Sequence, residues 1–139
     1  MDYSNFITHG FLVDDPKEPG EYYRKRFFPA PLRQNLETFV EFETDSPCGL
    51  FLWKYDDLAG HLGEEAMKNI RHRSMCAILY ETREEVDRGY ADLTSKGVKF
   101  LSPPQEWKWD DSDPEYECNS YAAYFVDRFG YLWELWAYI

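Results

Sequence analysis

The sequence predicts an α+β fold made of two tandem modules, each with a strand, a helix and two or three further strands. The first observation behind this prediction is an internal repeat, in which residues 10–23 and 77–90 each place a short apolar strand before a polar helix. The offset is constant, as Val13 aligns with Tyr80 and Tyr23 with Tyr90. The second observation is that a strand near the end of each half begins just after a glycine. With 139 residues and 44% hydrophobic content, the chain can form one core that both modules share.

The first module covers about residues 1–56 of this single domain. Its expected elements are, in order, a strand at 6–13, a helix at about 17–27, and a hairpin of strands at 38–44 and 50–55. The hairpin is placed by the turn-forming run at residues 45–49, which lies between two apolar stretches. A linker follows at about 57–73, where residues 64–70 favour a short helix.

The second module covers about residues 74–139 and repeats this order. Its first expected elements are a strand at 75–80, a helix at 83–96, and a strand that starts at 98–101. The helix should stop at Gly97, because glycine is common just past a helix C-terminus. Residues 121–139 predict a closing hairpin, with Asp127 and Gly130 at the first and fourth positions of its turn.

A single charged residue, Glu134, lies among large apolar side chains on the returning strand of this hairpin. Its neighbours are Leu132, Trp133, Leu135 and Trp136. Burying a carboxylate costs free energy unless a partner or water compensates for the lost hydration. We therefore expect Glu134 to face a cleft or to have a hydrogen-bond partner.

The charge balance argues against several classes of function. The chain has 26 acidic and 15 basic residues, a formal net charge of −11, which repels nucleic-acid phosphates and anionic lipid surfaces. We therefore expect no nucleic-acid partner and no membrane partner. No apolar run approaches the roughly 20 residues that span a bilayer, and the first residues do not resemble a signal peptide, so the sequence predicts a cytoplasmic protein. Three widely spaced cysteines indicate reduced, structural thiols.

Segments from both modules carry a family resemblance. They are residues 11–15 with Tyr22-Tyr23, Leu52-Trp53 with Leu58-Ala59, residues 82–87 running to Gly97, and residues 103–105, 124–127 and 130–134. Together they resemble the vicinal oxygen chelate superfamily, which includes lactoylglutathione lyase, bleomycin-resistance proteins, fosfomycin-resistance enzymes and extradiol dioxygenases. The sequence looks most like small bacterial glyoxalase-like proteins. The resemblance implies two βαβββ modules that form a curved mixed sheet around a cleft, and commonly a homodimer.

The resemblance also implies where metal ligands would lie in the metal-dependent members. Four strand positions that face the cleft supply them, and this chain has Thr8, Trp53, Met75 and Glu134 at those positions, with Trp53 as the repeat partner of Glu134. One carboxylate among four positions does not hold a divalent ion, which needs at least three suitable donors. We therefore expect neither a metal ion nor another cofactor.

A shift of one residue in two strands would give a different set of ligands. His9, Cys76 and Glu134 would then form a soft-metal triad, since neighbouring residues of a strand lie on opposite faces. Against this alternative, His9 alternates with Ile7 and Phe11, which assigns it to the face that packs on helices.

The same alternation predicts an aromatic-lined cleft with one acid in it. The expected ligand-binding residues are Thr8, Leu12, Phe51, Trp53, Tyr55, Met75, Leu79, Leu132 and Trp136, with Trp107 and Trp109 from a long loop. Aromatic walls suit flat or cationic organic ligands through stacking and cation–π attraction. Alternatively, these aromatic residues only fill the core, since 19% of the chain is aromatic.

The loop at residues 105–119 is longer than the corresponding link that the resemblance implies. It mixes acidic and aromatic residues, as a lid over a cationic ligand would. A solvated excursion and an arm that grips a second subunit are the alternatives.

Three roles stay open for Glu134. The first is a general base whose pKa is raised by apolar surroundings, and the second is an anchor for a cationic ligand. The third is a structural partner of a Lys, Arg, Tyr or Trp donor. The leading hypothesis is a metal-independent protein that binds a small organic molecule, aromatic or cationic, by sequestration or by acid–base chemistry at Glu134. The alternatives are a metal-dependent lyase, isomerase or dioxygenase, and a protein-interaction module that uses the acidic loop.

Overall fold

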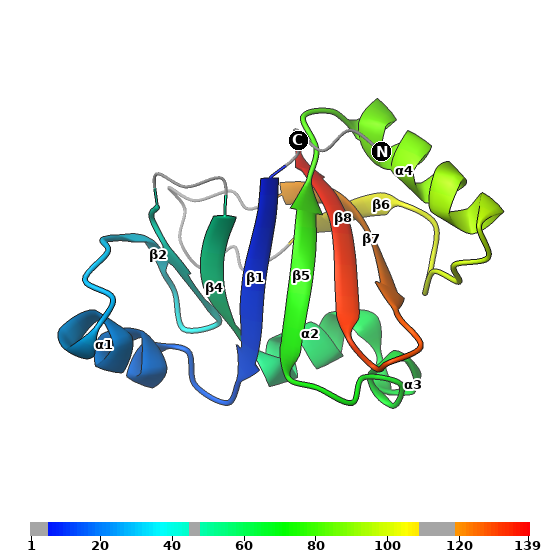
Figure 1. The fold of residues 1–139 in the computed structure, drawn as a ribbon. Coiled ribbons are helices and arrows are strands. Elements are labelled where there is room, and N and C mark those ends of the chain that lie inside the picture. The colour runs from blue at the N-terminus through cyan, green and yellow to red at the C-terminus, as the bar shows by residue number, and fades with distance from the viewer. Residues whose placement is uncertain (1–5, 45–47, 109–118) are drawn as a thin grey trace.

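One curled mixed sheet holds the strands of the chain. The computed structural model describes residues 6–44, 48–108 and 119–139, and its sheet has the strand order β2-β3-β4-β1-β5-β8-β7-β6 (Figure 1). The strands are β1 (Phe6–Val13), β2 (Leu32–Asn35), β3 (Phe39–Phe42), β4 (Cys48–Lys54), β5 (Ser74–Leu79), β6 (Gln105–Lys108), β7 (Asn119–Val126) and β8 (Leu132–Tyr138).

Strands β1 and β5 lie at the centre of the sheet and join its two halves. β1 pairs in parallel with β4 and antiparallel with β5, and β5 pairs in parallel with β8. Each half has the order strand, helix and three strands, with two further helices between the halves. Both halves contribute to one half-barrel. The predicted α+β fold, two βαβββ modules that form a curved mixed sheet, is confirmed.

Helices cover both faces of this sheet. They are α1 (Lys17–Arg26), α2 (Tyr55–Leu62), α3 (Glu64–Met67) and α4 (Arg83–Ser95). Val86 of α4 packs in the convex-face cluster that contains Ile78 and Leu135, whereas Leu58 of α2 and Met67 of α3 pack in the concave-face cluster. α2 and α3 accordingly lie behind the sheet in the view of Figure 1, and they close one end of the hollow that the curled sheet forms.

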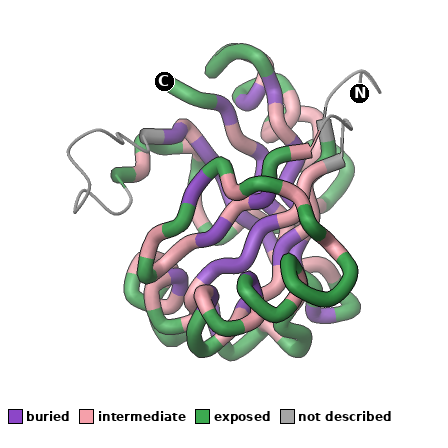
Figure 2. Tube along the Cα trace, turned by 90° about the vertical axis from the view of Figure 1, so that its left-hand side faces the viewer, coloured by how far each residue is buried: buried purple, intermediate pink, exposed green. Residues whose placement is uncertain are grey.

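Buried residues gather in the interior of the molecule, as Figure 2 shows, and strands β4, β5, β7 and β8 contribute most of them. Leu52 and Trp53 are adjacent on β4 and both buried, yet they belong to clusters on opposite faces of the sheet. Helices on both faces therefore explain why this strand is a continuous apolar run rather than an alternating one. None of the helices in the described part of the chain has the length and apolar composition that crossing a membrane requires.

Two predicted strands have different bounds in the structure. β4 ends at Lys54, so Tyr55 begins helix α2 instead of ending a strand. Residues 98–101 form no strand, and only Phe100 makes a bridge there, with Phe125. The strand of this region, β6, starts after two prolines, which lack the N–H that strand pairing uses. The additional edge strand β2 was missed because its sequence is mostly polar.

The strand pairing also corrects the repeat partner of Glu134. The sequence repeat aligns Gly10 with Ala77, and the sheet pairs Gly10 with Phe51 and Ala77 with Glu134. Phe51 therefore occupies the position in the first half that Glu134 occupies in the second. The predicted partner, Trp53, lies two residues further along β4.

Candidate ligand-binding site

Small side chains on the central strands leave a hollow in the concave face. Strand pairing places Thr8 beside Ala77 and Ala77 beside Glu134, in one row across β1, β5 and β8. Gly49 continues this row on β4, beside Thr8. Paired residues of neighbouring strands point to the same face, so this row forms a floor of small residues that ends at a carboxyl group. A cavity of about 70 Å³ lies over the floor.

Aromatic side chains form the walls of this cavity. They are Phe39, Phe51, Trp53, Trp136 and Tyr138. The Phe39 ring stacks on the Phe51 ring with 5.3 Å between centroids, and it meets the Trp53 ring edge to face at 5.8 Å. Trp136 and Tyr138 come from β8, on the other side of the floor, and their rings also meet edge to face, at 4.6 Å. The ring faces and edges suit a flat or cationic organic group.

Gly10 determines where the Phe51 ring lies. A Cβ atom at residue 10 would be 2.1 Å from Cε2 of Phe51, well inside van der Waals contact. The absence of a side chain at Gly10 therefore lets the ring lie against β1 and form part of the cavity wall.

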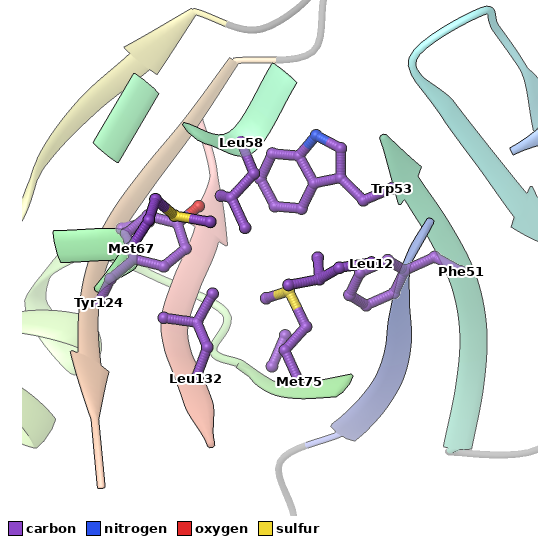
Figure 3. Packing of buried hydrophobic residues seen from close by; sticks show 10 residues of the cluster. Leu12, Phe51, Trp53, Leu58, Met67, Met75, Tyr124 and Leu132 are labelled. Carbon is purple, nitrogen blue, oxygen red and sulfur yellow. The ribbon is translucent and has the colours of Figure 1, made fainter. Parts of the chain in front are cut away.

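The deeper part of the concave face is packed core. Figure 3 shows the side chains of Leu58 and Met67, from the two linker helices, among those of Leu12, Met75 and Leu132 from the central strands. Each of these side chains is buried. Leu12, Met75 and Leu132, which the sequence predicts as ligand-binding, thus support the cavity from the side and do not line it.

Glu134 is a buried acid at the edge of the cavity floor. It lines the cavity but is only 7% exposed, and its Oε2 accepts a hydrogen bond from the hydroxyl group of Tyr124. Tyr124 is the direct partner of Glu134 in the pairing of β7 with β8. Burial raises the pKa of Glu134 to about 7, and the Tyr124 hydrogen bond acts in the opposite direction by favouring the ionised form. Glu134 can therefore gain or lose a proton near neutral pH.

Two more acids line the same cavity. Burial raises the pKa of Glu41, while the guanidinium of Arg33, 3.4 Å away, lowers it. Asp57 of α2 accepts a hydrogen bond of 2.9 Å from Nε1 of Trp53. Among the described residues that line the cavity, none is Lys, Arg or His. Arg33 already compensates the charge of Glu41, so Glu134 and Asp57 are the carboxyl groups of the lining that would favour a positively charged group.

Trp136 adds a hydrogen-bond donor to the wall. Its Nε1–H is buried and has no acceptor among the described residues. An unsatisfied buried donor costs about 1–3 kcal/mol. A ligand whose acceptor reached this N–H would recover part of that free energy.

The loop tryptophans have different positions. Trp107 lies outside the cavity lining, where its ring meets the Tyr124 ring edge to face at 5.5 Å and its Nε1 donates to the carbonyl of Ala122. It supports the hydroxyl-bearing ring that contacts Glu134. Trp109, with most of the long acidic loop, lies outside the described residues.

Comparisons with known proteins identify the fold. No protein-family model matches the chain, and no curated protein matches it. Among solved structures, it is similar to an NAD-dependent benzaldehyde dehydrogenase from Legionella pneumophila, with a TM-score of 0.70 and 17% identity over 96% of this chain and 99% of that chain. It is similar to a methylmalonyl-CoA epimerase in complex with methylmalonyl-CoA and NH4+, with a TM-score of 0.62 and 16% identity over 96% and 94% of the two chains. A glyoxalase/bleomycin resistance protein/dioxygenase superfamily member from Vibrio splendidus 12B01 gives a TM-score of 0.58 and 8% identity over 96% and 98%.

The chain has the vicinal oxygen chelate fold. At these identities the likeness concerns the fold alone. The fold places a sheet-lined hollow on the concave face, and here that hollow is the aromatic cavity with Glu134.

The vicinal oxygen chelate fold implies a metal ion in some members, and the donor groups of this cavity do not suit one. Within residues 6–44, 48–108 and 119–139, no three His, Cys, Asp or Glu side chains lie close enough together to hold a metal ion. Thr8 and Glu134 share the cavity floor, but Phe51 and Trp53 form its wall and Met75 is in the core. The four positions therefore offer a hydroxyl and one carboxyl group, which fall short of the donors that a divalent ion needs, and Glu41 and Asp57 do not group with Glu134 to supply the rest.

The alternative triad does not assemble either. His9 pairs with Cys76 and Cys76 with Trp133, so these side chains lie on the face opposite Glu134. Instead, Nδ1 of His9 lies 3.5 Å from Sγ of Cys76, and Nε2 of His9 lies 3.0 Å from Oγ of Ser74. The sequence argument that assigned His9 and Cys76 to the helix-bearing face agrees with this register.

Of the residues that the sequence proposed for ligand binding or catalysis, five line the cavity. They are Thr8, Phe51, Trp53, Glu134 and Trp136. Tyr55 and Leu79 do not line it; the Tyr55 ring instead contacts the guanidinium of Arg73, 4.1 Å from its centroid.

Other residues of the candidate site were missed. They are Phe39, Glu41, Asp57, Tyr124 and Tyr138. The hairpin identifies Tyr124 only when Gly130 is counted as an extra loop residue, because Asp127 then pairs with Tyr131 and Tyr124 lies opposite Glu134. No sequence signal brings Asp57 to the cavity, since its place depends on how α2 packs.

Proposed function

We propose that this protein binds a small organic ligand, aromatic or cationic, in the concave-face cavity without a metal ion. The observation that carries the proposal is Glu134, a buried acid beneath aromatic walls whose pKa is raised to about 7. The ligand's apolar part would replace water against Phe51 and Trp53. A cationic part would face Glu134, where a cation recovers free energy that the buried acid costs.

A pair of matched probes tests this proposal. 2-Phenylethylammonium and 2-phenylethanol share an aromatic body and differ in charge. Calorimetric titration at pH 8, with the fluorescence of Trp53 and Trp136 as a second readout, should show binding of the cation and weaker binding of the alcohol. Equal binding of both probes would support an aromatic ligand without a preference for charge.

A variant that fills the cavity provides the specific control. Ala77→Leu adds volume to the floor, so both probes should lose at least tenfold in affinity. Ala91→Leu makes the same chemical change at an exposed position of α4 and should leave affinity unchanged. If Ala77→Leu folds and binds as the wild type does, the cavity is not the binding site.

A second candidate function is proton transfer by Glu134. It is favoured by the same raised pKa, because a general base acts best when its pKa is near the working pH. Exchange of solvent deuterium into the carbon beside the carbonyl of small ketones and acids measures this activity by NMR. Glu134→Gln should abolish the exchange, whereas exchange that survives in Glu134→Gln would leave sequestration as the function.

We also propose that the protein is a cytoplasmic homodimer. The support is the commonly dimeric state of the family that the sequence resembles, together with a net charge of −11 that repels anionic lipid surfaces. Light scattering of the full chain and of a variant without residues 109–118 measures the oligomeric state. An unchanged dimer would remove the idea that the acidic loop is a dimer arm.

A further inference from the structure

A second recess lies at the turn end of the β7–β8 hairpin, away from the aromatic cavity. Its volume is about 320 Å³, and its walls include Asn69 and Arg71 from the connection between α3 and β5, Lys99 from the segment before β6, and Arg128 from the hairpin turn. The aromatic cavity lies toward the other end of the same hairpin, beside Ser120. No described residue lines both the aromatic cavity and the recess, so the recess is a separate site.

The recess gathers cations that have no carboxylate partner among the described residues. Nine of the 15 Lys and Arg residues form ion pairs with described carboxylates. Three of the other six are Arg71, Lys99 and Arg128, and all three line this recess. These three cations come from separate segments and have no ion-pair partner among the described residues. They make the local potential positive although the chain has a net charge of −11.

Of the described residues that line the recess, Asp127 is the one acid, and its carboxylate is already engaged. Oδ1 of Asp127 accepts hydrogen bonds from the N–H groups of Phe129, at 2.8 Å, and Tyr131, at 3.1 Å. Its Oδ2 accepts a third from Nε1 of Trp133, at 2.9 Å. The carboxylate of Asp127 thus holds the hairpin turn in shape, and it forms no ion pair with the three cations.

The stem of Arg71 is held in place by the turn. Its backbone N–H donates to the carbonyl of Gly130, at 2.9 Å. Gly130 has a φ of 89°, and a Cβ there would lie 2.6 Å from both Cβ and Cγ of Arg71. Glycine at this position therefore allows both the turn and the close approach of the arginine stem, which directs a long cationic side chain along the recess.

We propose that this recess binds a phosphate group, either as free phosphate or as part of a small organic phosphate. Guanidinium and ammonium groups from several directions match the oxygens of a tetrahedral dianion, and the amide of Asn69 offers a further donor. A recess of about 320 Å³ has room for the phosphate and part of an attached group. The site would let the protein respond to, or be anchored by, a phosphorylated small molecule independently of the aromatic cavity.

The test is a titration of the full-length protein followed by amide NMR. Inorganic phosphate and phenyl phosphate are added at constant ionic strength, with sodium chloride and acetate as the comparison anions. The amide signals of Arg71, Lys99 and Gly130 should shift in a saturable way with the two phosphates, while those of Thr8 and Ala77 stay in place. Tighter binding of phenyl phosphate than of phosphate would identify an organic phosphate as the ligand.

Matched variants decide whether the three cations cause the binding. Arg71→Gln, Lys99→Gln and Arg128→Gln should each weaken phosphate binding by roughly tenfold, because each removes a charge-assisted contact. Lys108→Gln removes an exposed cation that has no described ion-pair partner and lies on β6, outside the recess, so it should have no effect. Equal effects of all four variants, equal shifts with acetate, or no saturable shift would overturn the proposal. None of these outcomes depends on the aromatic cavity.

Discussion

Replacing Glu134 by glutamine should change the stability of the protein in a manner that depends on pH. Burial raises the pKa of Glu134 from 4.5 to about 7, and one pKa unit corresponds to about 1.4 kcal/mol of differential stabilisation of the two protonation states. We compare the free energy of unfolding of Glu134→Gln with that of the wild type. The difference in favour of the variant should be about 3 kcal/mol larger at pH 8 than at pH 4. For a chain of this size, that difference corresponds to a shift in Tm of roughly 10 °C.

The direction follows from which state binds the proton. Below pH 4.5 the carboxyl group of Glu134 is protonated in the folded and the unfolded protein alike. Between pH 4.5 and 7 the unfolded chain releases this proton while the folded protein keeps it. Wild-type stability therefore falls as the pH rises, and the stability that protonated Glu134 contributes is lost as the pH passes 7. Glutamine does not ionise, and its carbonyl oxygen can still accept the Tyr124 hydrogen bond.

Urea unfolding at a series of pH values measures this effect, with tryptophan fluorescence as the signal. Glu81→Gln is the matched control, because Glu81 is exposed and its substitution changes the net charge equally. Its effect on stability should be small and should not grow between pH 4 and 8. A Glu134→Gln variant whose stability differs from wild type by the same amount at both pH values would refute the claim that Glu134 is buried with a raised pKa.

Three further predictions follow from the same geometry. Tyr124→Phe keeps the ring but removes the hydrogen bond that favours ionised Glu134, so NMR titration should show a pKa of Glu134 above 7. Gly10→Ala should destabilise the protein by about 1–3 kcal/mol in thermal unfolding, because its Cβ collides with Phe51; Gly60→Ala, in open space on α2, should not. Elemental analysis should find no stoichiometric first-row metal, and finding one would favour the metal-dependent alternative.

The fold was predictable because its signals are local in sequence. A repeated strand and helix, and a turn with Asp127 and Gly130, fix the order of the elements without knowledge of tertiary contacts. β2 escaped prediction because an edge strand buries little and its sequence is polar. The end of β4 escaped because Trp53, Lys54 and Tyr55 have no residue that stops a strand, and the packing of α2 decides where the helix begins.

The candidate site was predictable only in part. Alternation along β1, β4 and β8 assigned Thr8, Trp53 and Glu134 to the concave face. It could not tell which concave-face residues line a cavity and which are covered, because that depends on where the linker helices pack. Leu58 of α2 fills the space beside Leu12, and this turns predicted lining residues into core.

The cost of burying Glu134 links stability to ligand binding. An ionised Glu134 opposes folding by about 3 kcal/mol at pH 8, out of the 5–15 kcal/mol that stabilise a typical domain. A cation placed against the carboxylate would favour its ionised form and lower its pKa, and by linkage the ionised protein would bind the cation more tightly. The affinity for 2-phenylethylammonium should therefore rise from pH 5 to pH 8, with its midpoint near pH 7, and this rise should vanish in Glu134→Gln. 2-Phenylethanol, which has no charge, should show no such rise. A cation affinity that is flat across this range would mean that the ligand binds the aromatic walls without contacting Glu134.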